Sequence, residues 1–147
     1  MQFPPNPNLP SVGNRVIDSE HNKLFGMIND IGQLIYLNHG VALTVALKLL
    51  NGGLRDYFAV EERIAHAVDF DFTNHRVAHE NLLNEIKFIT NKIISQNNKW
   101  SSLEKKNYIK SLNDCLIQHI KVESKPFKTV LDTCLYDFKP GGSTTSK

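Results

Sequence analysis

The chain has 147 residues, with 17 Lys+Arg against 15 Asp+Glu and a formal net charge of +2 at pH 7. This length suits one domain, which buries roughly 70% of the surface of its unfolded chain and needs no metal merely to stay folded. The basic residues are scattered and no run of about 18 apolar residues occurs, so neither nucleic acid nor a membrane is expected as a partner.

The first ten residues, MQFPPNPNLP, contain neither the charged region nor the apolar stretch of a secretory signal. We therefore expect a soluble cytoplasmic protein, with a monomer as the default state. Two cysteines without such a signal do not make a disulfide framework, so Cys115 and Cys134 are expected to be buried free thiols.

Apolar residues recur every three or four positions in four long segments, a spacing typical of amphipathic helices. The first helix is predicted to begin after Asp18 or Ser19, either of which can cap it. The second is predicted over about 41–68 and contains Gly52 and Gly53, which indicate close packing or a bend.

The third helix is predicted to begin at Thr73 or Asn74, and the fourth near Ser101, which forms a capping-box pattern with Glu104. Both helices carry an apolar stripe that is expected to face the core. The residues of these stripes are Leu82, Leu83, Ile86, Ile89, Ile93, Ile94, Ile109, Leu112, Leu116 and Ile120.

Short connections between the four helices make neighbours antiparallel. The predicted fold class is therefore all-α, an up-down-up-down antiparallel four-helix bundle. The bundle is expected to span 1–136 with an irregular N-terminal arm over 1–17, and the polar segment 137–147 is expected to be a flexible tail.

Two histidines at the start of the third helix, His75 and His79, are four residues apart and leave the same helix face. Such a pair alone is more often solvated than bound to a metal. Here Leu82, Leu83 and Ile86 continue the same stripe, which predicts that both imidazoles point into the bundle.

The other helices also carry metal-capable residues, namely His21, Glu61 and His119. The alternative for a lone histidine such as His119 is an ordinary core residue bonded to a carbonyl, and the alternative for Glu61 is an ordinary solvated helix turn. Several unpaired imidazoles among leucines would cost about a few kcal/mol each, and a metal that accepts their lone pairs removes that cost. Convergence from four helices therefore predicts a metal site.

Four pieces of the chain carry a family resemblance: SVGNRVIDSEHNKLFGMIND, YFAVEERI, NHRVAHE and CLIQHIKVESK. With these four pieces in this order, the chain resembles the hemerythrin family, in particular single-domain bacteriohemerythrins, from about Ser11 to Phe127. The resemblance implies a four-helix bundle with a carboxylate-bridged pair of irons that binds dioxygen reversibly. Five histidines and two bridging carboxylates normally hold those irons.

Residue by residue, the resemblance implies that His75, His79 and His119 hold one iron. It implies that His21 is a ligand of the second iron and that Glu61 bridges the two. These five residues form the predicted metal site.

Two positions depart from the family pattern. Tyr57 stands where the family has histidine, and Ser124 where it has the bridging aspartate. Tyr57 can either ligate a ferric ion as a phenolate or hydrogen-bond His21 or a water, and Glu123, one turn after His119, is a candidate bridge in place of Ser124. One iron and two are both open, and zinc is a further candidate metal.

The resemblance implies a non-haem iron protein that binds or senses dioxygen, peroxide or nitric oxide in a pocket lined by Ile28, Phe58 and Leu82. Efficient oxygen transport is not expected, because the family mechanism needs one electron from each of two irons. The first alternative is a metal-dependent oxidase or peroxidase, although we do not expect an enzyme. The second is an iron-storage bundle or a structural-metal bundle that has lost oxygen chemistry.

Overall fold

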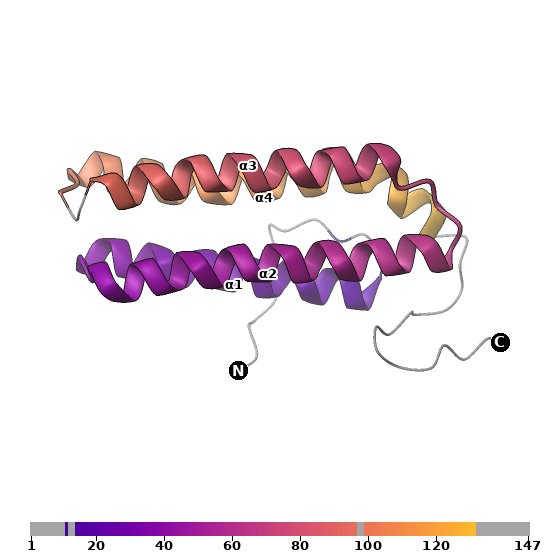
Figure 1. Cartoon of the computed structure of the whole chain (residues 1–147), viewed down its shortest axis with the longest axis horizontal. Helices are drawn as coiled ribbons and strands as arrows, with labels where there is room; N and C mark the ends of the chain where they lie inside the picture. The colour runs from indigo at the N-terminus through magenta and orange to yellow at the C-terminus, as the bar shows by residue number, and fades with distance from the viewer. Residues whose placement is uncertain (1–10, 12–13, 97–98, 132–147) are drawn as a thin grey trace.

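The four helices of the computed structural model form an antiparallel bundle (Figure 1). The structure describes residues 11, 14–96 and 99–131, with side chains described as far as residue 122. The helices are α1 (Arg15–Leu37), α2 (Gly40–Ala67), α3 (Thr73–Ser95) and α4 (Ser102–Leu131), and the described residues include no strand.

Consecutive helices run in opposite directions, and each packs against two others (Figure 1). Helix α1 packs on α2 and α4, and α3 packs on α4 and α2. The predicted all-α four-helix bundle is confirmed. The predicted tail over 137–147, Cys134 and most of the predicted N-terminal arm lie outside the described residues.

Helix α1 begins at Arg15, earlier than the predicted start after Asp18 or Ser19, so that prediction is wrong. The side chain of Asn14 is the reason, because its Oδ1 accepts hydrogen bonds of 3.0 Å from two backbone N–H groups of the first turn. Asp18 instead lies in the first turn, where its negative charge is favourable near the positive end of the helix dipole.

The starts of α3 and α4 agree with the predicted positions, but only one uses the predicted cap. At α4, Ser101 N–H donates to Glu104 Oε1 at 2.9 Å and Glu104 N–H donates to Ser101 Oγ at 3.1 Å, which confirms the capping box. At α3, the side chain of Asp71 accepts hydrogen bonds from the backbone N–H and the hydroxyl of Thr73, at 3.1 and 2.8 Å.

The two glycines in α2 have different surroundings. A Cβ atom at Gly53 would lie 2.8 Å from Met27 Sδ of α1, whereas a Cβ atom at Gly52 would meet nothing within 4 Å. The expected close packing therefore applies to Gly53, where α1 and α2 approach each other.

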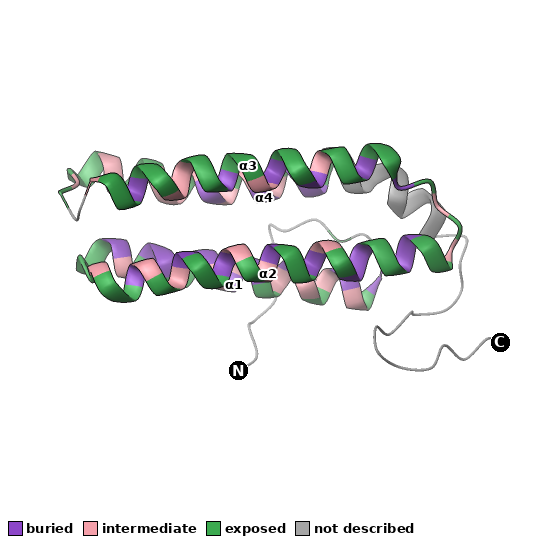
Figure 2. Cartoon of the chain, viewed as in Figure 1, coloured by how far each residue is buried: buried purple, intermediate pink, exposed green. Residues whose placement is uncertain are grey.

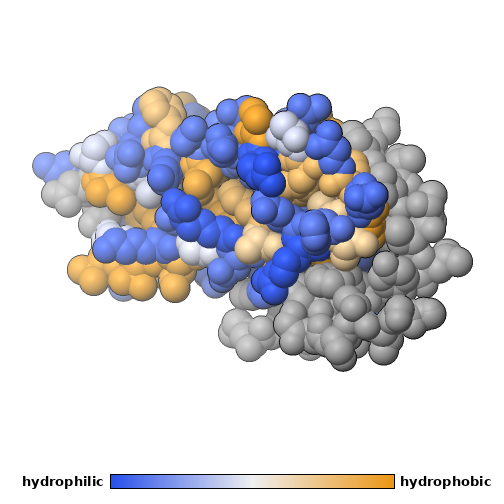
Figure 3. All heavy atoms as spheres, turned by 45° about the vertical axis from the view of Figure 1, so that its right-hand side comes forward, coloured by the Kyte–Doolittle hydropathy of each residue, from blue (hydrophilic) through white to orange (hydrophobic). Residues whose placement is uncertain are grey.

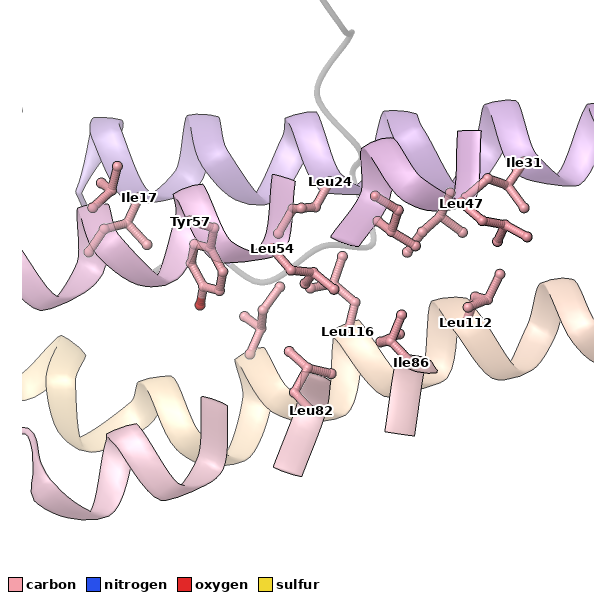
Figure 4. Packing of buried hydrophobic residues seen from close by; sticks show 14 of the residues in the cluster. Ile17, Leu24, Ile31, Leu47, Leu54, Tyr57, Leu82, Ile86, Leu112 and Leu116 are labelled. Atoms are coloured by element: carbon pink, nitrogen blue, oxygen red, sulfur yellow. The ribbon is translucent and has the colours of Figure 1, made fainter. Parts of the chain in front are cut away.

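Buried side chains line the inner face of each helix (Figure 2), and Leu82 and Ile86 of α3 meet Leu54 of α2 and Leu116 of α4 in the centre (Figure 4). Ile94 departs from the prediction, because 47% of it is exposed. It follows the fully buried Ile93, and consecutive residues on a helix are rotated by about 100°, so Ile94 lies toward the edge of the buried face. The face shown in Figure 3 mixes hydrophilic and hydrophobic side chains, and no described helix is long and apolar enough to span a membrane.

Candidate metal centre

Four of the five predicted metal ligands meet in the interior of the bundle. Glu61 comes from α2, His75 and His79 from α3, and His119 from α4. One potential ligand atom from each of these residues lies within 4.8 Å of the others. We call these four residues the Glu/His cluster.

Each member of the cluster lies on the apolar face of its helix. His75 and His79 share a face with Leu82 and Ile86, as the four-residue spacing predicts. None of the cluster residues is more than 5% exposed. Burial of this kind is costly for polar groups unless they bind one another or a ligand.

The carboxylate of Glu61 is the centre of the cluster. Its Oε1 accepts hydrogen bonds from the Nε2 atoms of both His75 and His79, each at 2.7 Å. Its Oε2 accepts a hydrogen bond from the Tyr57 hydroxyl at 3.1 Å. One buried carboxylate therefore contacts three side chains from two helices.

Tyr57 connects the cluster to His21 on α1. Its side chain is fully buried, and its Oη lies 3.0 Å from His21 Nε2 and 3.2 Å from His119 Nε2. In Figure 4 the tyrosine ring projects from α2 into the interior of the bundle. His21 is thus beside the Glu/His cluster rather than within it, and Tyr57 is the contact between them.

The second ring nitrogen of His21, Nδ1, is buried and has no hydrogen-bond partner among the described residues. A buried polar atom in that state costs about 1–3 kcal/mol, so His21 is not explained as an ordinary satisfied core residue.

Two phenylalanines hold the imidazole rings of α3. Phe58 stacks on His79, with ring centroids 4.1 Å apart and an interplanar angle of 15°. Phe72 stacks on His75, with centroids 4.8 Å apart and an angle of 29°. These contacts restrict ring rotation and exclude water from one side of the cluster.

The surroundings favour the neutral forms of His21, His79 and His119 and the charged form of Glu61. Burial lowers the pKa of His21 to about 4 and that of His119 to about 3, although the negative charge of Glu61 opposes both shifts. Burial also lowers the pKa of His79. For Glu61, burial raises the pKa, but the hydrogen bonds from His75 and His79 outweigh burial and leave the pKa below its usual value.

The cluster offers three imidazole nitrogens and one carboxylate oxygen. This donor set suits iron, zinc or manganese, and four protein donors leave a position open when the metal prefers five or six ligands. The residues present therefore fit a divalent transition metal.

The remaining predicted site residues lie elsewhere or are not described. The side chains of Glu123 and Ser124 lie outside the described part of the chain. Ile28 is buried, while Phe58 and Leu82 line two different pockets, so the predicted oxygen pocket stays a prediction.

The two pockets differ in their relation to the cluster, because a cluster residue lines only the smaller one. A pocket of about 770 Å³ is lined by Phe58 and Phe72, together with residues at the end of α2 and the start of α3. A smaller pocket of about 190 Å³ lies between α3 and α4 and is lined by Leu82 and by His119 of the cluster. Neither pocket could be identified from helical periodicity, because each depends on the sizes of side chains on two facing helices.

No family model, no curated protein and no solved structure matches the chain. The fold and the site themselves define the class of protein. It is an all-α four-helix bundle with a buried Glu/His/His/His cluster that could bind a metal ion.

Proposed function

We propose that the protein is a non-haem iron protein that binds or senses dioxygen or a related small molecule such as peroxide or nitric oxide. The observation that carries the proposal is the convergence of Glu61, His75, His79 and His119 on one buried point. The resemblance of the sequence to the hemerythrin family supports iron as the metal.

Bound iron would supply a redox-active centre with a position free for a small molecule. The side chains have separate roles around it. Glu61 would provide negative charge that offsets the charge of the cation, and the three imidazoles would provide lone pairs. Phe58 and Phe72 hold two of the rings in place and limit access of water.

Tyr57 determines whether the proposed centre holds one metal or two. Its Oη lies 3.0 Å from His21 Nε2 and 3.1 Å from Glu61 Oε2. These distances suit hydrogen bonds, and Tyr57 would also be placed to give its phenolate oxygen to a metal held by His21 and Glu61. Tyr57 therefore either hydrogen-bonds within a mononuclear centre or becomes a phenolate ligand of a second metal.

Metal content and a visible spectrum separate these outcomes. The protein is expressed with iron available, oxidised, and analysed for metal per chain beside the Tyr57→Phe variant. About two irons, with a broad phenolate absorption that Tyr57→Phe removes, mean a dinuclear centre that includes Tyr57. About one iron without that absorption means a mononuclear centre. A folded protein without stoichiometric metal would overturn the proposal, and zinc alone would favour the structural-metal alternative.

The small-molecule part of the proposal needs its own measurement. The reduced, iron-loaded protein is exposed in turn to dioxygen, peroxide and nitric oxide while its visible spectrum is recorded. We expect a spectral change that is lost in His119→Ala, which removes a ligand of the cluster, and kept in His66→Ala, which changes an exposed histidine outside it. An iron-loaded protein that responds to none of the three molecules would leave only metal storage or a structural metal. Repeated turnover of peroxide would instead indicate the oxidase or peroxidase alternative.

A further inference from the structure

We infer that divalent metal ions reach the Glu/His cluster through the pocket between α3 and α4. The inference rests on the proposed function, because it concerns how the same centre is loaded. The pocket has a volume of about 190 Å³, and its walls include Asn81, Leu82 and Glu85 of α3 and Cys115, Gln118 and His119 of α4.

The burial of the cluster makes a route necessary. Glu61 is fully buried, and each of the three histidines is at most 5% exposed. A metal ion can therefore reach these donors only through an opening beside one of them or by separation of the helices.

The smaller pocket is the one of the two that touches the cluster. His119 forms part of its wall. The larger pocket of about 770 Å³ does not include a residue of the cluster, and it ends against Phe58 and Phe72. Because these rings stack on His79 and His75, they separate that pocket from the donor atoms.

The size of the smaller pocket suits an ion with part of its hydration shell. A volume of about 190 Å³ has room for several water molecules, because about 10–15 Å³ of such space already holds one. Pockets for organic ligands are larger, on the order of 300–1,000 Å³. The pocket is therefore matched to a hydrated ion or a molecule of a few atoms.

The polar residues of the pocket suit a cation. Glu85 is exposed and contributes a carboxylate, while Asn81 and Gln118 contribute amide oxygens that can replace water around a cation. The thiol of Cys115 lies 3.3 Å from Glu85 Oε2, and burial together with Glu85 raises its pKa to about 12. Cys115 therefore stays protonated at neutral pH and does not trap the ion as a thiolate would.

A kinetic experiment with Co²⁺ tests the route, because protein-bound Co²⁺ has visible absorption bands. Loading of metal-free protein is followed by stopped-flow absorbance, and release is followed after addition of a chelator. We expect Asn81→Trp, which fills the pocket, to slow loading at least about tenfold, or about 1.4 kcal/mol of added barrier. Release should slow by the same factor with Kd unchanged, because a blocked path changes the barrier and not the end states.

Two tryptophan variants serve as matched controls. Asn84→Trp adds the same bulk to the exposed face of α3 at a residue that lines none of the described pockets. Ala59→Trp narrows the larger pocket instead. We expect both to load at the rate of the unmodified protein. A slowed Ala59→Trp with an unchanged Asn81→Trp would place the route in the larger pocket, and equal rates in all variants would mean loading by separation of the helices. Either result overturns the inference.

A charge variant covers the case in which Asn81→Trp also weakens Kd by disturbing the nearby ligands. Glu85→Gln leaves the pocket open but removes its carboxylate, and it is expected to slow Co²⁺ loading most strongly at low salt. An unchanged loading rate in Glu85→Gln would then overturn the inference. Failure of the unmodified protein to bind Co²⁺ is a different result, because it would count against the metal centre itself.

Discussion

Acidification from pH 7 to pH 5 is expected to destabilise the metal-free protein by about 4 kcal/mol, through His21 and His119. Burial lowers the pKa of these histidines from 6.5 to about 4 and about 3. Between pH 7 and pH 5 each histidine of the unfolded chain binds on average about 0.7 proton, whereas the same residue in the folded protein binds almost none. Integrated over the two pH units, this difference contributes about 2 kcal/mol for each histidine.

The direction follows from the lowered pKa of the folded state. A histidine that is neutral when buried stabilises the fold fully above the unfolded pKa of 6.5, and this stabilisation is lost as the pH falls toward the folded pKa. Burial shifts the pKa of His79 in the same direction, which adds to the effect. The pKa of Glu61 is also lowered, but from 4.5, so this carboxylate contributes below the range considered.

The measurement is urea denaturation of metal-free protein at pH 7 and pH 5, followed by far-ultraviolet circular dichroism. His119→Gln should lose about half of the pH dependence, because one of the two buried imidazoles is removed. His66→Gln, at an exposed position outside the cluster, should keep all of it. A free energy of unfolding that is equal at both pH values, or higher at pH 5, would refute the assignment of neutral buried histidines.

Two further predictions concern the stability of the helices. Gly52→Ala should raise the free energy of unfolding by about 0.5–1 kcal/mol, because the added Cβ enters open space. Gly53→Ala should have a free energy of unfolding at least about 1 kcal/mol lower than that of Gly52→Ala, because its Cβ would lie 2.8 Å from Met27 Sδ. Equal unfolding free energies for this pair would contradict the close approach of α1 and α2. Asn14→Ala should lower the free energy of unfolding by about 1 kcal/mol in the same denaturation assay, because it removes the N-cap hydrogen bonds. Asn14→Asp should keep a value near that of the unmodified protein. An unchanged free energy of unfolding in Asn14→Ala would mean that the Asn14 cap does not stabilise the helix.

The fold and the centre of the site could be predicted from the sequence because both depend on angular position around a helix. The spacing of His75 and His79 within an apolar stripe indicates that both rings point inward, and the same holds for His119 beside Leu112 and Leu116. These positions are fixed by the helical repeat and change little with details of packing.

The position of the Tyr57 hydroxyl could not be predicted in the same way. Its contacts with His21, Glu61 and His119 depend on the length of the side chain and on the distances between three helices. The sequence therefore left open a phenolate ligand and a hydrogen-bonded phenol.

The start of α1 was also missed, for a different reason. Asn14, Asp18 and Ser19 are all residue types that favour an N-cap, and only the geometry of the Asn14 side chain identifies the one that caps the helix. Local residue preference narrows the choice to a few positions, and contacts made in the folded chain decide between them.

The hydrogen bonds from His75 and His79 to Glu61 determine which nitrogen of each imidazole ring carries the hydrogen. Both rings approach the same carboxylate oxygen through Nε2, at 2.7 Å. A carboxylate can only accept hydrogen bonds, so each ring must carry hydrogen on Nε2, the nitrogen whose lone pair a cation would need. Cation binding at these atoms therefore requires a change of tautomer, in which each ring loses the hydrogen on Nε2 and gains one on Nδ1. The carboxylate that would help to hold the cation also stabilises the tautomers that must disappear before the cation can bind.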